Sequence, residues 1–341
     1  NFFFIVNSKS IINFFDHIDY FIYRFFKKKQ LVLRLQFIMK YFCNSPVLFH
    51  VWNRIDVVKK VFLKIRETKP KKLYFSSDGP NNIEDKVKIH KIRNYIKNNI
   101  DWNCKLKEIF FRKNLGPKLA ITKAINEVFK TEKKLIIIDH DCLCDNSFFK
   151  FTDELLELYE NEKKIKLISG NYICKNLIKF DKSYYFANHP VIFGWATWKR
   201  SWIEYDIEMK KFKKFGSFFW LLTFFNFNIA KTLYFYNKFK LSKKGKINTW
   251  DYQLLFSIWN NNGLVIRPTV NLSKHIGWGE QAYHGKHEDD LKDIKVEKMK
   301  FPLKHPKYIE VNKEADEHEY KRIRKLFFWR SIFFYIKQYL S

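Results

Sequence analysis

The chain has 341 residues, of which 46% are hydrophobic, and a formal net charge of +29 at neutral pH. A chain of this length and composition can bury a large core, which excludes a protein that is disordered throughout. The lysines are spread along nearly the whole sequence, so the excess charge favours an anionic partner: nucleic acid, a membrane surface or an anionic small molecule. A genome-wide compositional bias would explain the same excess without any function.

Cysteine usage and hydropathy bear on the compartment. The five cysteines are odd in number and form no CxxC motif, which argues against a disulfide framework and favours a reducing compartment. No secretory signal is evident, and the longest apolar stretch, residues 215–230, falls short of the roughly 18–20 residues that cross a bilayer. We therefore expect a cytoplasmic protein that is soluble or bound peripherally to the inner face of the membrane.

Both ends of the chain combine aromatic and basic residues at helical spacing. Residues 1–44 are expected to form an N-terminal amphipathic helical segment and residues 291–341 a C-terminal basic helical segment, with one domain at 45–290 between them. Such helices either attach a protein to an anionic membrane surface or pack on its central domain. The sequence leaves both alternatives open.

Strand-like and helical patterns alternate through the first half of the central domain. Short apolar runs predict strands at 47–52, 73–75, 106–111, 135–138 and 165–169. Helical spacing is found between them, at 57–65, 87–96, 118–129 and 147–159. This order predicts an α/β fold with an open, mostly parallel, doubly wound sheet and helices on both faces. In such sheets ligands bind beyond the carboxyl ends of the strands.

Acidic residues follow two of these predicted strands. Asp78 comes after the second, and Asp139 and Asp141 follow the aliphatic run at 135–138. Residues two apart in an extended segment share a face, so Asp139 and Asp141 are able to reach the same cation or its ligand. Carboxylate oxygens are hard donors that suit Mn²⁺ or Mg²⁺. The alternative for an isolated Asp-x-Asp is a solvated turn.

Several motifs together resemble one enzyme family. The string from Leu135 to Cys142, followed by Ser147-Phe148-Phe149, resembles the metal-binding segment of GT-A glycosyltransferases. It is most similar to bacterial nucleotide-diphospho-sugar transferases akin to N-acetylglucosaminyltransferase I. Further matches occur in the same order at 46–54, 76–80, 114–116, 169–171, 194–198, 250–253 and 271–279. The resemblance covers about residues 46–287, so it implies a GT-A type fold for the domain at 45–290 and leaves the ends outside.

The resemblance implies roles in donor binding. Asn53 and Arg54 match the turn after the first strand, and Asp78 matches the turn that contacts the nucleotide. Asp139 would hold the ribose or a metal-bound water. Asp78 has a structural alternative, because Asp before Gly-Pro is a common turn former.

The same motif implies a metal site. Asp141 occupies the ligand position for Mn²⁺ or Mg²⁺, and His140 stands where the family usually has a central Asp. A neutral imidazole can still bind Mn²⁺, but the site loses one negative charge, which puts the metal dependence in question.

The later motifs imply a base and a pocket. Asp251 matches the general base that takes the proton of the acceptor hydroxyl; its alternative is a favourable acidic residue at a helix start. Gly194 and Trp195 would shape the sugar pocket together with Trp198, or else Trp195 and Trp198 belong to an ordinary aromatic core. His275 or His284 would contact the donor diphosphate from a glycine-containing loop.

The resemblance thus implies an inverting glycosyltransferase that uses a UDP-sugar, with UDP-N-acetylglucosamine as the family-based choice. The acceptor would be a surface glycan or its lipid-linked precursor. One alternative is a catalytically impaired sugar-nucleotide-binding protein, which the His140 departure favours. A basic nucleic-acid-binding protein is less consistent with the motifs, because acidic turns repel phosphate unless a cation intervenes.

Overall fold

The computed structural model describes residues 41–174, 178–278 and 294–322. The chain divides into two units, Asn1–Phe42 and Cys43–Ser341, and the fold described below belongs to the second. Of the two predicted helical ends, 1–44 and 291–341, residues 1–40 and 323–341 lie outside the described residues, so helices there stay predictions. Residues 294–312 are described and form no helix, whereas residues 313–322 are helical. In the part of the chain that is described, no helix is long and apolar enough to cross a membrane.

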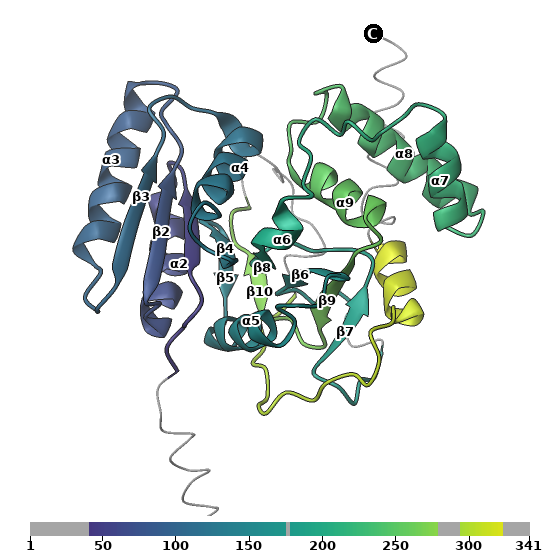
Figure 1. The fold of residues 1–341 in the computed structure, drawn as a ribbon. Helices are drawn as coiled ribbons and strands as arrows, with labels where there is room; N and C mark the ends of the chain where they lie inside the picture. The colour runs from purple at the N-terminus through teal and green to yellow at the C-terminus, as the bar shows by residue number, and fades with distance from the viewer. Residues whose placement is uncertain (1–40, 175–177, 279–293, 323–341) are drawn as a thin grey trace, which may run out of the picture. The chain divides into compact units, whose positions relative to one another are not determined.

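An eight-stranded sheet forms the centre of the second unit, with the strand order β3-β2-β1-β4-β8-β6-β9-β7 (Figure 1). The first four strands along the chain, β1 to β4, run parallel to one another, and β6 runs parallel to β9. β8 is antiparallel to β4 and β6, and β7 is antiparallel to β9. The strands are β1 Val47–Val51, β2 Lys72–Ser77, β3 Lys105–Phe110, β4 Lys134–Asp139, β6 Ile165–Ser169, β7 Tyr184–Ala187, β8 Trp195–Trp198 and β9 Leu264–Pro268.

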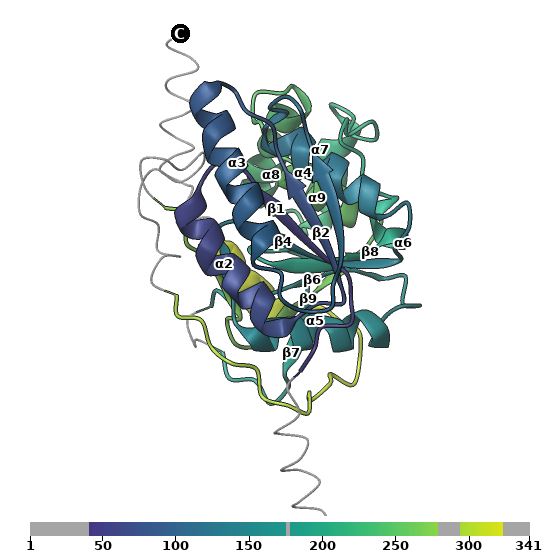
Figure 2. The same cartoon turned by 90° about the vertical axis from the view of Figure 1, so that its left-hand side faces the viewer.

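Helices cover both faces of this sheet, as Figure 2 shows for α2 and α3 on one side and α4 on the other. Successive residues of β1 point to opposite faces. Leu48 shares a buried cluster with Ile121 of α4, whereas the Phe49 ring packs 6.3 Å from Phe62 of α2. The helices are α2 Ile55–Thr68, α3 Ile83–Asn98, α4 Gly116–Val128, α5 Asn146–Leu158, α6 Lys199–Trp202, α7 Gly216–Phe224, α8 Ile229–Lys243 and α9 Asp251–Asn260. The predicted α/β class, with a mostly parallel sheet between helical layers, is confirmed.

The predicted series of strands and helices is found in the predicted order. The strand at 165–169 has the predicted bounds, and the others differ by a few residues at their ends. β7, β8 and β9 were not among the predicted strands. The sequence of β8, Trp-Ala-Thr-Trp, is too short to show a period, and its pairing between β4 and β6 determines that it is a strand. The apolar stretch at 215–230 forms α7 and the beginning of α8.

A second, two-stranded sheet lies at the end of β4. It pairs β5, Cys142–Cys144, with β10, Ser273–His275, in antiparallel register. The paired residues are 129 to 133 positions apart in sequence, so this pairing fixes where the late part of the chain meets the early part.

Residues 294–322 pack along the β7 and β9 side of the sheet. The N–H of Asn312 donates to the Phe186 carbonyl at 2.8 Å, beside a parallel bridge between Phe186 and Val311. Within helical residues 313–322, the fully buried Glu319 forms an ion pair with the fully buried Arg267 of β9, at 2.7 Å. The Tyr185 hydroxyl donates to the same carboxylate at 2.7 Å. This ion pair joins the end of the described chain to the sheet.

The substitution Glu319→Gln removes the charge that compensates Arg267 in the interior. Breaking one partner of a buried pair costs about 3–5 kcal/mol, because an uncompensated buried charge remains. We expect Glu319→Gln to lower the free energy of unfolding in urea by that amount. Glu84→Gln, which removes one partner of the exposed Lys88 ion pair, is the matched control and should leave the midpoint unchanged. Equal midpoints for both variants would refute the role given to the Arg267 pair.

Candidate active site

The carboxyl ends of β1, β2 and β4 meet at one edge of the sheet. His50 of β1 lies opposite Asp139 of β4 in register, and the His140 N–H donates to the His50 carbonyl at 2.9 Å. The Asp78 N–H donates to the carbonyl of Val51 at 3.0 Å. The acidic turns singled out in the sequence therefore follow neighbouring parallel strands at the same edge, where open α/β sheets bind ligands.

The β5–β10 pairing brings His275 onto the acidic turn. His275 lies opposite Cys142, and the Ile276 N–H donates to the Asp141 carbonyl at 2.8 Å. The His275 Nε2 atom is 3.0 Å from the Asp141 Oδ2 atom, although the two residues are 134 positions apart. Of the two candidate histidines, His275 is thus at the turn, and His284 lies outside the described residues.

Gly277 closes the loop tightly over Asp141. A Cβ atom on Gly277 would lie 2.7 Å from the Asp141 Oδ2 atom, so a larger residue has no room there. The Arg54 Nη1 atom donates to the Gly277 carbonyl at 2.6 Å, and its Nη2 atom is 3.5 Å from the Asp56 carboxylate. The predicted donor residue Arg54 therefore lies beside the loop that carries His275.

The two carboxylates of the turn have opposite pKa shifts. Burial, and then the charge of Asp141, raise the pKa of Asp139 to about 8. Burial alone would also raise the pKa of Asp141, but His140 and the hydrogen bond from His275 outweigh it and lower that pKa below its ordinary value. At neutral pH the turn therefore presents one ionised carboxylate beside one protonated carboxyl, an arrangement that gives neighbouring acids separate roles.

Two neutral histidines border these carboxyl groups. Burial, with a smaller contribution from His140, lowers the pKa of His50 to about 3, and burial lowers the pKa of His140 as well. The His50 Nδ1 atom is 3.0 Å from the Ser76 hydroxyl. His50 was not among the predicted site residues. The sequence does contain a signal for it, because His50 is the one polar residue of the apolar strand Val47–Val51 and stands next to the carboxyl end of that strand.

The donor atoms of the turn bear on the predicted cation. Among the residues that the structure describes, no three His, Cys, Asp or Glu side chains are grouped to hold a metal ion. Among the described residues, the Asp141 Oδ1 atom nevertheless accepts one weak contact, from the Cys142 thiol at 3.7 Å. Mg²⁺ is commonly held by one or two carboxylates together with substrate phosphates. The residues present fit a cation shared with a diphosphate, and not a cage made by the protein alone.

Asp78 makes structural contacts at the same edge. Its carboxylate accepts the backbone N–H groups of Gly79, Leu115 and Gly116, at 2.7, 2.9 and 3.1 Å. Gly116 is the first residue of α4, so Asp78 satisfies donors that a helix start leaves unpaired. Burial raises the pKa of Asp78 and these hydrogen bonds oppose the shift. The turn-forming alternative is thus realised, and the nucleotide contact of Asp78 stays a prediction.

Asn53, like Asp78, makes a contact that supports the local fold. Its side-chain amide donates to the Asp85 carboxylate in the first turn of α3, at 2.7 Å. The contact fixes the turn after β1 against the helix that follows β2. A direct contact of Asn53 with the donor stays a prediction.

Gly194 and Trp195 lie where β8 begins, at the same edge. Gly194 has a φ of +84° and no room for a side chain, since a Cβ atom would lie 2.7 Å from the Cys144 sulfur. The Trp195 indole is fully buried and stacks on Trp250 at 5.4 Å. Trp198, also buried, donates to the Leu156 carbonyl at 2.9 Å. Both indoles occupy core positions, so their predicted contact with a sugar remains untested.

Asp251 is the first residue of α9, which follows a loop lying at this edge. Trp250 stacks on Trp195, and the Asn248 side chain approaches to 3.6 Å of the Cβ position of Gly116, next to Asp78. The Asp251 carboxylate accepts from the Thr249 hydroxyl and, at 2.8 Å, from the Tyr252 N–H. The structure therefore gives Asp251 a helix-start contact directly after the loop that approaches Gly116, and its role as a base stays a prediction.

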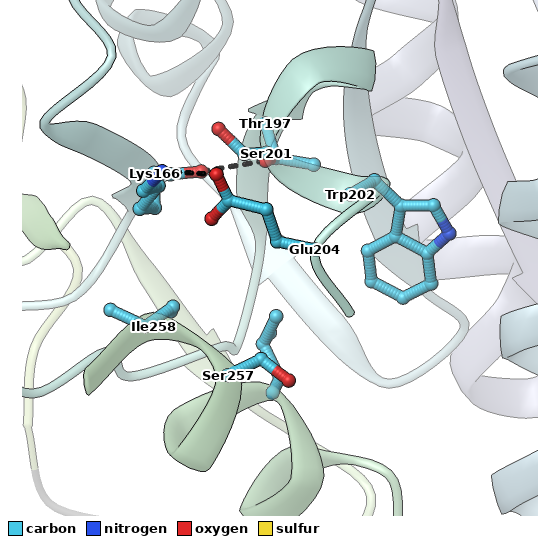
Figure 3. A pocket seen from close by; sticks show the side chains of 8 residues that line it. Lys166, Thr197, Ser201, Trp202, Glu204, Ser257 and Ile258 are labelled. Atoms are coloured by element: carbon cyan, nitrogen blue, oxygen red, sulfur yellow. Dashed lines mark hydrogen bonds and ion pairs between the residues drawn. The ribbon is translucent and has the colours of Figure 1, made fainter. Parts of the chain in front are cut away.

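Figure 3 shows a small cavity elsewhere in the domain, between β6, β8 and α9. Its volume of about 10 Å³ is that of one water molecule. The Lys166 amine and the Glu204 carboxylate on its wall form an ion pair at 2.6 Å. Thr197, which also lines it, lies opposite Leu135 at the amino end of β4, so the cavity is remote from the acidic turn.

No family model and no curated protein matches the chain. Solved structures match it distantly. One is the apo form of a UDP-glucose pyrophosphorylase, with 11% identity and a TM-score of 0.34, and another is a UDP-glucose pyrophosphorylase complexed with UDP-glucose, with 10% identity and a TM-score of 0.32. Each comparison covers 66% of this chain and 90% of the other. Likenesses at these scores give no information about what this chain binds.

The substitution Gly277→Ala tests the packing of the loop on Asp141. The added methyl group has no space against the Asp141 side chain, so either the loop or the carboxylate must move. Overpacking of this kind costs about 1–3 kcal/mol. We expect that loss in urea unfolding, and none for the control Gly216→Ala, whose Cβ would meet its nearest neighbour at 3.7 Å. An unchanged Gly277→Ala midpoint would show that the loop does not pack on the turn as described.

Proposed function

We propose that the protein is an inverting glycosyltransferase that transfers a sugar from a nucleotide-diphosphate donor at the carboxyl edge of β1, β2 and β4. The observation that carries the proposal is the 3.0 Å contact between Asp141 and His275. The family resemblance implies that Asp141 holds the metal at the donor diphosphate and that His275 or His284 contacts the same diphosphate, and 134 residues separate Asp141 from His275. A chance resemblance of short motifs gives no reason for such a meeting, whereas a shared diphosphate site does.

The donor in this proposal is a UDP-sugar, with UDP-N-acetylglucosamine as the leading choice. Asp141, assisted by His140, would hold Mn²⁺ or Mg²⁺ at the diphosphate. When bound, such a cation stabilises the charge that develops on the phosphate oxygens. Arg54 and His275 lie beside Asp141 and supply further positive charge or hydrogen-bond donors to the same group. Asn53, Asp78 and Asp139 would contact the nucleoside, and Gly194 and Trp195 would border the sugar.

Asp251 is the proposed general base. In an inverting transfer the acceptor hydroxyl attacks the anomeric carbon, its proton passes to a carboxylate, and the nucleoside diphosphate departs. Such a base typically contributes ~10²–10⁴-fold to the rate. The position of Asp251 at the start of α9, beside the loop that reaches Gly116, is consistent with this role. The acceptor would be a surface glycan or its lipid-linked precursor.

The second candidate is a sugar-nucleotide-binding protein with impaired catalysis. The observation that favours it is His140, which stands in the acidic turn in place of a carboxylate. Burial lowers the pKa of His140 and raises that of Asp139, so neither residue supplies the negative charge that a cation would require. Hydrolysis or transfer of a UDP-sugar in the presence of Mn²⁺ would eliminate this alternative.

The metal assignment is tested by calorimetry of UDP-sugar binding with and without Mn²⁺. Asp141→Ala should abolish the cation-dependent part of the affinity, because it removes the ionised ligand of the turn. His140→Asp should tighten Mn²⁺ binding by adding a negative charge. Asp181→Ala, which removes an exposed carboxylate far along the chain, serves as the control. Undiminished binding by the Asp141 variant would remove the cation from the proposal.

The base assignment is tested by Asp251→Asn, which keeps the size of the side chain and its helix-start hydrogen bond but cannot accept a proton. We expect turnover to fall ~10²-fold or more while donor affinity stays within about threefold. Transfer rate and donor affinity are measured in parallel with the control Asp181→Asn. Wild-type turnover would leave Asp251 with its helix role alone, and a loss of donor affinity would place it in the binding site.

A further inference from the structure

Exposed apolar side chains are concentrated on the α7–α8 pair. Figure 1 shows these helices on the outside of the domain, with α9 between them and the sheet. Within residues 215–233, five large apolar side chains are between 46% and 71% exposed. They are Phe215, Phe219, Phe227, Ile229 and Leu233. Soluble proteins rarely gather such residues on one surface without a partner for it.

Helical spacing arranges these residues in stripes. Phe215 and Phe219 lie four residues apart at the beginning of α7, and Ile229 and Leu233 lie four apart on α8. Residues at this spacing share one side of a helix. The opposite sides are already used: Leu221, Phe235 and Phe239 are buried against α9, where Phe239 packs 5.4 Å from Phe256. The exposed stripes are therefore not the core-facing sides of the two helices.

The turn between the helices adds a strained aromatic residue. Asn226 and Phe227 have φ values of +50° and +62°. This region is unfavourable for a bulky side chain, and outliers of this kind concentrate at functional surfaces. The Phe227 N–H donates to the Leu222 carbonyl at 2.7 Å, which holds this turn at the end of α7, and the side chain is 71% exposed.

The charge around this surface has one sign. Residues 209–250 contain ten lysines and no Asp, Glu or Arg, so this segment has a formal charge of +10. Seven of these lysines are exposed: Lys210, Lys211, Lys213, Lys214, Lys243, Lys244 and Lys246. Their charge favours an anionic partner and opposes a second copy of a chain that carries +29 in total. Apolar side chains flanked by lysines match the boundary between headgroups and acyl chains in an anionic bilayer.

We propose that the α7–α8 pair, residues 210–246, is a surface that docks on anionic membranes by inserting Phe219, Phe227 and their apolar neighbours among the lipids. The helices lie on the bilayer and do not cross it, since α7 has nine residues and α8 has fifteen. The inference does not depend on the proposed enzymatic activity. It also differs from attachment through the chain ends, because it rests on the middle of the sequence.

The test uses the full chain and sedimentation with vesicles of phosphatidylcholine, alone or mixed with phosphatidylglycerol. We expect binding to the mixed vesicles that weakens as salt rises. Phe219→Ser with Phe227→Ser should weaken it at least about tenfold. The matched control, Ile83→Ser with Leu158→Ser, removes two exposed apolar residues elsewhere and should change the affinity less than about twofold, by the same partition argument.

A second pair of variants tests the charge. Lys210, Lys211, Lys213 and Lys214 changed together to Gln should remove most of the salt dependence. The control changes four exposed lysines outside the surface, Lys86, Lys91, Lys163 and Lys298, and should retain it. An environment-sensitive fluorophore on Phe227→Cys should report an apolar environment with mixed vesicles, and one on Ile83→Cys should not.

Four results would overturn the proposal. They are no binding to either vesicle, equal binding to neutral and anionic vesicles, unchanged binding of the Phe219/Phe227 variant, and a change of that variant from oligomer to monomer. The third result would locate attachment elsewhere in the chain, and the fourth would identify a second copy as the partner of this surface. Circular dichroism of each variant confirms that it is folded.

Discussion

The candidate site depends on the pairing of β5 with β10, two strands of three residues each. Without it, the turn after β4 would be an acidic loop at the edge of a sheet, and His275 would have no reason to approach it. The pairing also sets the position of Gly277, whose missing side chain lets the loop lie directly on Asp141. A very small area of backbone contact therefore determines the chemistry of the site, and the larger sheet supplies its rigid support.

The electrostatics of this edge follow from how crowded it is. Four titratable side chains are close together at this edge. Asp139, His140 and Asp141 are consecutive, and His50 lies opposite Asp139 on the neighbouring strand. Burial penalises every charge there, and His140, followed by the hydrogen bond from His275, outweighs burial at Asp141 and lowers its pKa. The neighbours remain neutral and act as hydrogen-bonding groups. A site of this kind is ready to accept additional positive charge.

Much of the architecture could be predicted from the sequence because the signals were local. The aliphatic run before Asp139 and the alternation of strands with helices indicate parallel strands buried on both sides, and β1 to β4 are found as expected. The position of the acidic turns at the carboxyl edge follows from that topology. β8 and the β5–β10 pair were not predictable, because strands of three or four residues are too short to show a periodic pattern, and the pairing of β5 with β10 joins residues 129 to 133 positions apart. The same separation explains why the sequence could not decide which of His275 and His284 approaches the acidic turn. The hydrogen bonds from the start of α4 to Asp78 were likewise not visible in the sequence.

The two edges of the large sheet are protected from self-association in different ways. The outer strand β3 has the sequence Lys-Leu-Lys-Glu-Ile-Phe, and its charged side chains discourage another strand from adding to it. At the other edge, the residues of β7 are aromatic or apolar, Tyr-Tyr-Phe-Ala. If this edge were uncovered, its unpaired backbone groups could pair with a strand of another chain. The backbone of Val311 and Asn312 occupies that edge at Phe186. The segment after residue 294 thus covers the one apolar edge of the sheet, and its loss would expose β7 to aggregation while leaving the candidate site, which lies at β1, β2 and β4, in place.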